Sequence, residues 1–147
     1  MLGVKIGIDF GSTNLTLCED DKGIVISEPS VVICDKYTGT PIAFGARARK
    51  MSGKLPGSMC EVYPIKDGMV NDFKIARFML RSYIDRLCKN RLFKPNILMS
   101  VPGSVTELEK KTLLDVIYSA GAGRACFLDE ALAAAIGSGV SLTEPKG

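Results

Sequence analysis

Residues 3–20, "GVKIGIDFGSTNLTLCED", are the most informative part of the sequence. An apolar run ends at Asp9, a bend of Gly11 and three small polar residues follows, and a second alternating run then begins. Two such runs around a short polar bend predict a β-hairpin with strands over 3–10 and 14–19. The bend raises a chemical question, because it gathers a lone carboxylate and several small hydrogen-bonding groups at one point.

An aspartate at the end of a buried strand needs a physical reason, because an unpaired buried carboxylate is costly. Asp9 could bind Mg²⁺ through water molecules, because this ion keeps several of its waters and usually takes only one or two carboxylates together with phosphate oxygens. Gly11 would then let the backbone approach a phosphate closely, and Ser12, Thr13 and Asn14 would offer donors to its oxygens. The alternative is an ordinary turn, since these are the usual turn residues.

Downstream of residue 70 the hydrophobic period changes, and helices alternate with strands. Right-handed crossovers would place the later strands parallel in one sheet, so the fold class is α/β. The insertion at about 30–70 is strand-poor and predicts a small flanking subdomain. The expected elements are a short strand over 41–45 with a short helix after it, a helix over 72–90 with Asn71 or Asp72 as N-cap, a central strand over 96–102, a helix opened by a Thr106–Glu109 capping box, a further central strand over 124–129 and a helix over 130–139.

A second group of acids falls where the strand over 124–128 meets the last helix. Ligands of open α/β folds bind at the carboxyl ends of strands. Glu130 could there orient a water for attack on a γ-phosphate. The alternative is that Asp129 and Glu130 only complement the helix N-terminal dipole.

The composition excludes several classes of function. The chain of 147 residues has no histidine, so a Ser-His-Asp or Cys-His mechanism is excluded. Its five cysteines are widely spaced without a CxxC, which favours reduced thiols in a cytoplasm over a disulfide frame or a zinc site. The net charge of +3 lacks a basic block, so we expect no nucleic-acid partner. We also expect no signal peptide and no membrane span.

Five segments, in order, resemble the actin-like ATPase superfamily and most closely its MreB family of bacterial cell-shape proteins. They are "IGIDFGSTNLTL", "GIVISEPSVV", "PGSMCEVYPIKDGMVNDFKIARFMLRSYI", "VPGSVTELEKKTLLDVIYSAGA" and "FLDEALAAAIGSG". The resemblance implies a ribonuclease H-like actin-type ATPase domain. Subdomain IA would span 1–30 and 71–147 and be incomplete, and a small inserted subdomain IB would span 31–70.

The resemblance also implies roles for the residues singled out above. Asp9 matches the aspartate that faces the Mg²⁺ hydration shell, and residues 11–14 match the loop around the β- and γ-phosphates of ATP or GTP. Glu130 matches the acid that positions the hydrolytic water. Two positions depart from the family pattern: Asp129 stands where a glutamate is usual, and Ala131 where a proline is usual.

The implied function is a bacterial cytoskeletal protein that controls cell shape through nucleotide-dependent filament assembly. It would be cytoplasmic, peripheral at the inner face of the cell membrane, with itself and other cell-shape and cell-wall synthesis proteins as partners. Because the resemblance covers only the N-terminal half of the family, we expect weak or absent nucleotide binding by this chain and no turnover. The alternatives are a sugar or acetate kinase and a heat-shock-type ATPase chaperone of the same superfamily.

The stretch "RLFKP" adds an expected membrane contact. Leu92 and Phe93 match a pair that inserts into the membrane surface in some MreB proteins, and Lys89, Arg91 and Lys94 surround them. Two exposed apolar residues ringed by cations suit an anionic lipid surface. The alternative is that the pair packs back onto the end of the preceding helix.

Overall fold

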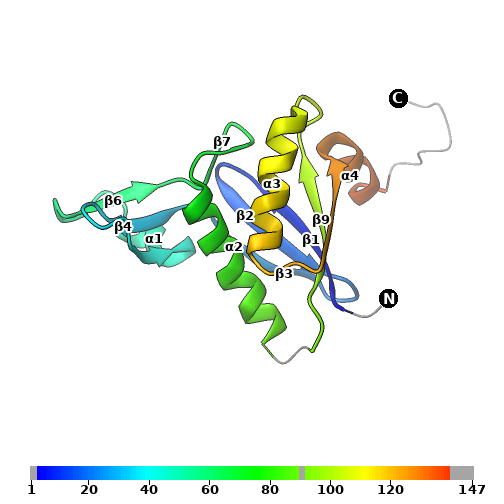
Figure 1. Ribbon diagram of the computed structural model, residues 1–147, viewed down its shortest axis with the longest axis horizontal. Coiled ribbons are helices and arrows are strands. Elements are labelled where there is room, and N and C mark those ends of the chain that lie inside the picture. The colour runs from blue at the N-terminus through cyan, green and yellow to red at the C-terminus, as the bar shows by residue number, and fades with distance from the viewer. Residues whose placement is uncertain (1–2, 90–91, 140–147) are drawn as a thin grey trace.

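The opening hairpin forms the middle of a five-stranded mixed sheet in the computed structural model, which describes residues 3–89 and 92–139 (Figure 1). The strands run in the order β10-β9-β1-β2-β3. β1 pairs antiparallel with β2 and parallel with β9, which confirms the predicted hairpin and crossover. The strand bounds are β1 Lys5–Phe10, β2 Asn14–Glu19, β3 Gly23–Pro29, β9 Asn96–Val101 and β10 Arg124–Asp129.

The two faces of this sheet differ in what covers them. The alternation of β1 sends Ile6, Ile8 and Phe10 into the core, where they are at most 7% exposed. The helices α2 (Phe73–Cys88) and α3 (Glu107–Ser119) lie across that face (Figure 1). The opposite face carries the remaining side chains of β1, and much of it stays open.

Both covering helices begin where the sequence predicts. The carboxylate of Asp72 accepts the Ile75 amide at 3.0 Å and caps α2. Thr106 and Glu109 form the predicted capping box of α3, in which each side chain accepts the other residue's backbone N–H. Because these caps depend on neighbours in sequence, they could be predicted locally.

The segment between β3 and α2 contradicts the prediction that it is strand-poor. It holds a three-stranded sheet in the order β5-β4-β6, the two-stranded hairpin β7-β8, and the helix α1. These strands have only two or four residues, too few for an alternating pattern to stand out. The bounds are β4 Val32–Asp35, β5 Pro41–Phe44, α1 Gly45–Met51, β6 Met59–Val62, β7 Ile65–Lys66 and β8 Met69–Val70.

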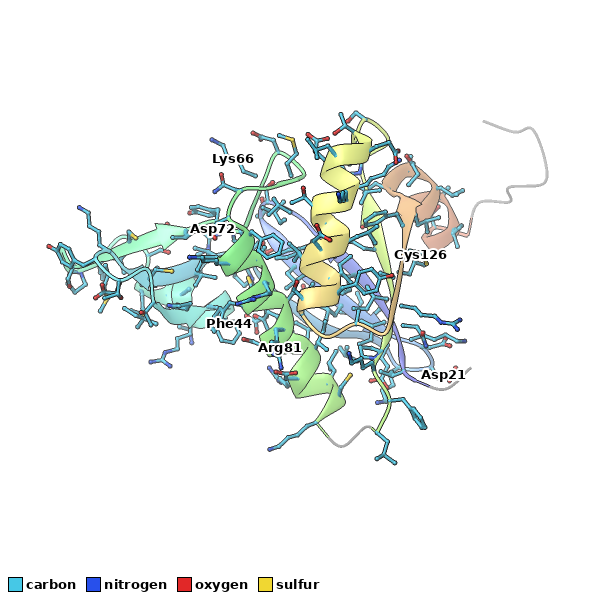
Figure 2. All side chains as sticks on the ribbon, viewed as in Figure 1. Asp21, Phe44, Lys66, Asp72, Arg81 and Cys126 are labelled. Atoms are coloured by element: carbon cyan, nitrogen blue, oxygen red, sulfur yellow. The ribbon has the colours of Figure 1, made fainter. Side chains whose placement is uncertain are left out.

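The small sheet has its own apolar cluster and is joined to α2 by aromatic rings. Val31, Ile33, Ala43 and Ala48 make up the buried part of that cluster. At the junction, the Phe44 ring, marked in Figure 2, meets the rings of Phe78 and Tyr83 edge-on, with centroids 5.5 and 5.3 Å away. Edge-to-face contacts of this kind add to the stabilisation from apolar burial.

The position of β10 corrects a second prediction. Its apolar run predicted a central strand, but β10 lies at the edge of the sheet and none of its residues is fully buried. An apolar run alone does not reveal how many neighbours a strand has. α4 (Glu130–Gly137) follows β10 directly and contacts both β9 and β10. Of the described helices, none is long and apolar enough to span a bilayer.

Candidate functional site

The carboxyl ends of the three parallel strands meet at one edge of the main sheet and enclose a small cavity. β1 ends at Phe10, β9 at Val101 and β10 at Asp129. Parallel α/β sheets bind ligands at this edge. The cavity has a volume of about 230 Å³, and its lining comprises Phe10, Gly11, Ser12, Asp67, Gly68, Met99, Ser100, Val101, Pro102, Leu113 and Glu130.

Backbone hydrogen bonds shape the bend between β1 and β2. Gly11 N donates to Asn14 O at 2.9 Å, and Ser30 N donates to Thr13 O at 2.8 Å from the neighbouring chain segment. A Cβ at Gly11 would stand 3.2 Å from Asn14 O, so a side chain here would crowd the bend. Ser12 lines the cavity, and within the described part of the chain its hydroxyl makes no hydrogen bond, so it can donate to a ligand.

Only part of the predicted loop reaches the cavity. Gly11 and Ser12 line it together with Glu130, whereas Thr13 and Asn14 are exposed and lie outside its lining. The structure therefore joins the first half of the bend to the predicted water-positioning acid, although the chain separates them by more than a hundred residues.

Asp9 is exposed, which corrects the premise that it is a buried carboxylate. It belongs to the face of β1 that α2 and α3 leave open, so it avoids the desolvation penalty that the sequence suggested. Its polar contact is with Ser100, whose hydroxyl stands 3.4 Å from both Asp9 Oδ1 and Ile8 O. Asp9 lies beside the cavity rather than in its lining.

Asp129 and Glu130 have different structural roles. Asp129 Oδ1 accepts the amides of Ala131 at 2.8 Å and Leu132 at 3.2 Å, so Asp129 is the N-cap of α4. Glu130 is the first residue of α4 and lines the cavity. Proline lacks an N–H, so the proline that the resemblance implies at position 131 could not donate the first of these bonds. Asp129 and Ala131, the two departures from the implied pattern, therefore form one cap.

The tip of the β7-β8 hairpin contributes residues that the sequence did not assign to the site. Asp67 and Gly68 form its turn with φ angles of 52° and 77°, and both line the cavity. A Cβ at Gly68 would come within 2.9 Å of Pro102 Cγ, so the tip packs closely on the loop after β9. Residue types such as Asp67 and Gly68 favour a turn, but nothing local to them indicates which strand ends the turn touches.

The donors at this edge suit the Mg²⁺-nucleotide that the resemblance implies. Within residues 3–89 and 92–139, no three potential ligands gather closely enough to hold a metal ion. Mg²⁺ commonly relies on one or two carboxylates, water and phosphate oxygens rather than a protein cage. Asp9 and Glu130 can supply carboxylate oxygens, and Ser12 can donate to a phosphate.

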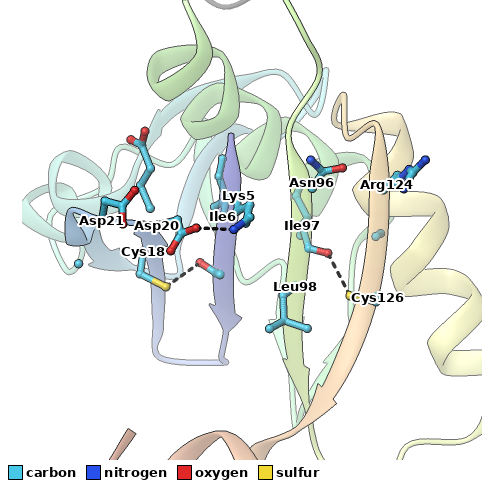
Figure 3. Close-up of a pocket in the computed structure, with 14 residues that line it drawn as sticks. Lys5, Ile6, Cys18, Asp20, Asp21, Asn96, Ile97, Leu98, Arg124 and Cys126 are labelled. Atoms are coloured by element: carbon cyan, nitrogen blue, oxygen red, sulfur yellow. Dashed lines mark hydrogen bonds and ion pairs between the residues drawn. The ribbon is translucent and has the colours of Figure 1, made fainter. Parts of the chain in front are cut away.

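A larger hollow lies on the open face of the sheet and has a different chemistry (Figure 3). Its volume is about 810 Å³, and Gly7, Cys18, Leu98 and Cys126 contribute to its floor. Lys5 and Asp20 form an exposed ion pair at 2.7 Å on its rim. None of the predicted site residues belongs to its lining, so its size does not make it the phosphate site.

The predicted membrane residues lie away from both hollows. Leu92 is 96% exposed and Phe93 is 50% exposed, so neither is packed into the core. Lys89 and Lys94 are exposed as well. Arg91, the third cation of the predicted group, lies outside the described residues.

Comparisons with known proteins agree on one family. A family model described as MreB/Mbl protein matches residues 3–147. The cell shape-determining protein Mbl of Bacillus subtilis is 37% identical over all of this chain and 44% of its own length. The cell shape-determining protein MreB of Escherichia coli is 33% identical with the same coverage. The chain thus spans less than half the length of these relatives.

Solved structures extend the agreement to three dimensions. The crystal structure of MreB5 of Spiroplasma citri bound to ADP matches 99% of this chain and 44% of its own, with a TM-score of 0.91 at 31% identity. The MamK double helical filament, at 18% identity and a TM-score of 0.78, shares the fold. The chain belongs to the MreB/Mbl family and has an α/β fold of the actin type.

Proposed function

We propose that this chain supplies the phosphate-binding and water-positioning part of a nucleotide site, and that the complete site controls assembly of a cell-shape filament. The observation that carries the proposal is the cavity that joins Gly11 and Ser12 to Glu130 at the strand ends. Two solved structures of one relative support it: MreB5 of Spiroplasma citri has been crystallised with ADP and with AMPPNP. The match over 3–147 is to the cell-shape family, which disfavours the kinase and chaperone alternatives.

Each residue of the proposed site has one task. Asp9 would hold Mg²⁺ through water, and the amides and hydroxyls of residues 11–14 would bind phosphate oxygens. Glu130 would orient the attacking water, a positioning task that phosphoryl transfer requires. Mg²⁺-ATP, when bound, would supply the γ-phosphate and the charge-neutralising ion. The Asp129 cap would hold the first turn of α4, and hence Glu130, at the cavity edge.

The size of the cavity predicts how much of the nucleotide this chain holds. A volume of about 230 Å³ is below the roughly 300–1,000 Å³ typical of ligand pockets. It suits the phosphate end, so the nucleoside must be bound by the part of the longer relatives that this chain does not cover. We also propose that 1–30 and 71–147 form subdomain IA and 31–70 forms subdomain IB of a two-sided cleft, because a separate three-stranded sheet lies between β3 and α2.

Calorimetry and a chimera test this proposal. The chain alone should show no measurable heat with Mg²⁺-ATP, and micromolar affinity would contradict the half-site. A chimera of this chain with the remaining part of Bacillus subtilis Mbl should bind and hydrolyse ATP. In it, Glu130→Gln should keep binding but lose hydrolysis, and Asp9→Asn should weaken Mg²⁺-dependent binding.

The matched control in the chimera is Glu107→Gln, since Glu107 is an exposed acid in the first turn of α3, away from the cavity lining. It should leave both binding and hydrolysis unchanged. Normal hydrolysis by the Glu130→Gln chimera would refute the role of Glu130 even if filament assembly were retained.

We also propose that the exposed tip of Leu92 and Phe93 contacts the inner face of the cell membrane. The observation in favour is their exposure, 96% and 50%, beside the exposed cations Lys89 and Lys94. Basic residues near an anionic leaflet add about 1 kcal/mol each. Sedimentation with anionic liposomes should fall after Leu92→Asp with Phe93→Asp, and unaltered sedimentation would refute the contact. Leu108→Asp is the matched control, because Leu108 is 74% exposed on α3.

A further inference from the structure

Two cysteines stand directly opposite each other in the small sheet. Cys34 on β4 and Cys60 on β6 are register partners in an antiparallel pair, and both are free thiols. Opposed residues of an antiparallel pair project from the same face of the sheet. The two sulfur atoms therefore lie on one side, toward the main core, with which both residues pack.

The register places the pair within reach of a disulfide. Lys36 N donates to Ser58 O at 2.8 Å, so these opposed residues occupy a hydrogen-bonded position. Hydrogen-bonded pairs recur at every second residue of an antiparallel ladder, so Cys34 and Cys60, two residues along each strand, also form a hydrogen-bonded pair. The Cα atoms of such a pair are about 5.5 Å apart. Disulfides span Cα separations of about 4.4–6.8 Å.

A bond at this position would be easy to reduce again. Opposed Cβ atoms lie about 4.5–5.5 Å apart and are farther apart in hydrogen-bonded pairs, whereas a disulfide needs about 3.8 Å. The strands must be drawn together to close the bond. Strained disulfides have more oxidising potentials, a property of labile and regulatory bonds rather than of structural ones.

The two thiols differ in access. Cys34 is 1% exposed, and burial, with Cys60 and Asp72 nearby, raises the pKa of its thiol to about 11. Cys60 is half-buried on β6, an edge strand of the small sheet. A reagent therefore meets Cys60 first, and Cys34 reacts in the second step.

We propose that Cys34 and Cys60 form a reversible dithiol–disulfide pair that tethers the edge strand β6 to β4 when the chain meets a low-molecular-weight disulfide. The Cys60 thiolate attacks one sulfur of that disulfide, which releases one small thiol and leaves a mixed disulfide. The Cys34 thiolate then attacks the Cys60 sulfur and displaces the second small thiol. The two protons from the protein thiols end on the released thiols, so the reagent is reduced as the pair is oxidised. This inference is independent of the nucleotide proposal.

Peptide mapping tests the pair directly. The native chain is treated with glutathione disulfide, its remaining thiols are alkylated, and it is digested with trypsin. Cleavage after lysine places Cys34 in peptide 23–36 and Cys60 in peptide 55–66, each with a single cysteine. The expected product is these two peptides joined, and separated again by dithiothreitol. Hydrogen exchange at the β6 amides should slow in the oxidised chain.

Cysteine variants separate the two steps. Cys34→Ser should leave glutathione attached to Cys60, and Cys60→Ser should leave Cys34 unmodified. A variant with Cys18→Ser and Cys126→Ser should still form the joined peptides, because these exposed cysteines lie on the main sheet, with β1 and β9 between them. Glutathione on Cys18 and Cys126 without joined peptides would overturn the proposal. So would joined peptides that form only in urea.

Discussion

The substitution Gly68→Ala tests whether contact with Pro102 holds the β7-β8 hairpin at the candidate site. Gly68 has a φ of 77°, and an added Cβ would stand 2.9 Å from Pro102 Cγ. The chain offers a matched control in Gly53, which has nearly the same φ of 78° but nothing within 4 Å of an added Cβ. The two alanine variants therefore share the backbone cost and differ in the steric contact.

The expected magnitudes follow from these two terms. A left-handed backbone costs a non-glycine residue roughly 1–2 kcal/mol, which both variants should show. Overpacking against a ring that cannot move freely adds about 1–3 kcal/mol at Gly68 alone. Gly68→Ala should therefore be less stable than Gly53→Ala by about 1–3 kcal/mol.

Urea unfolding followed by circular dichroism measures the free energy of unfolding of both variants. Adding Pro102→Ala to Gly68→Ala removes the ring and should recover much of the excess loss. Equal losses for Gly68→Ala and Gly53→Ala would refute the role of Pro102. So would a double variant in which the losses simply add, since residues in contact should not behave independently.

Three further predictions concern the helices that cover the main sheet. Thr106→Val removes the hydroxyl that accepts the Glu109 amide, and should lower the free energy of unfolding by about 1 kcal/mol in urea; an unchanged value would show that the cap is not needed. The amide and hydroxyl of Thr106 hold the pKa of the Glu109 carboxyl below its usual range. The ionised Glu109 carboxylate therefore stabilises the folded chain above the ordinary glutamate pKa, and this stabilisation is lost as the pH falls through the lowered pKa. Glu109→Gln should flatten the acid side of a plot of unfolding free energy against pH. Leu80→Ala empties a fully buried site on α2 and should cost about 2–5 kcal/mol in thermal or urea unfolding; a loss near zero would contradict the packing of α2.

Much of the fold could be predicted from the sequence because its elements depend on neighbouring residues. The hairpin of residues 3–20, the α2 cap at Asp72 and the capping box of Thr106 and Glu109 are local patterns, and the structure confirms them. Within 31–70 the predicted short strand and the helix after it are present as β5 and α1, whereas the remaining strands, of two or four residues, lack a readable period. The roles of Asp9, the bend residues and Glu130 remain predictions.

Sequence patterns alone sufficed for the order of the main-sheet strands and their helices, for the family and for the two stretches that meet at the cavity. Which side chains share a surface depends on the tertiary structure. It exposed Asp9, placed β10 at the sheet edge, brought Asp67 to the cavity and set Cys34 opposite Cys60. The reason is that periodicity and caps act over a few residues, whereas register and packing join segments tens of residues apart, where no local signal exists.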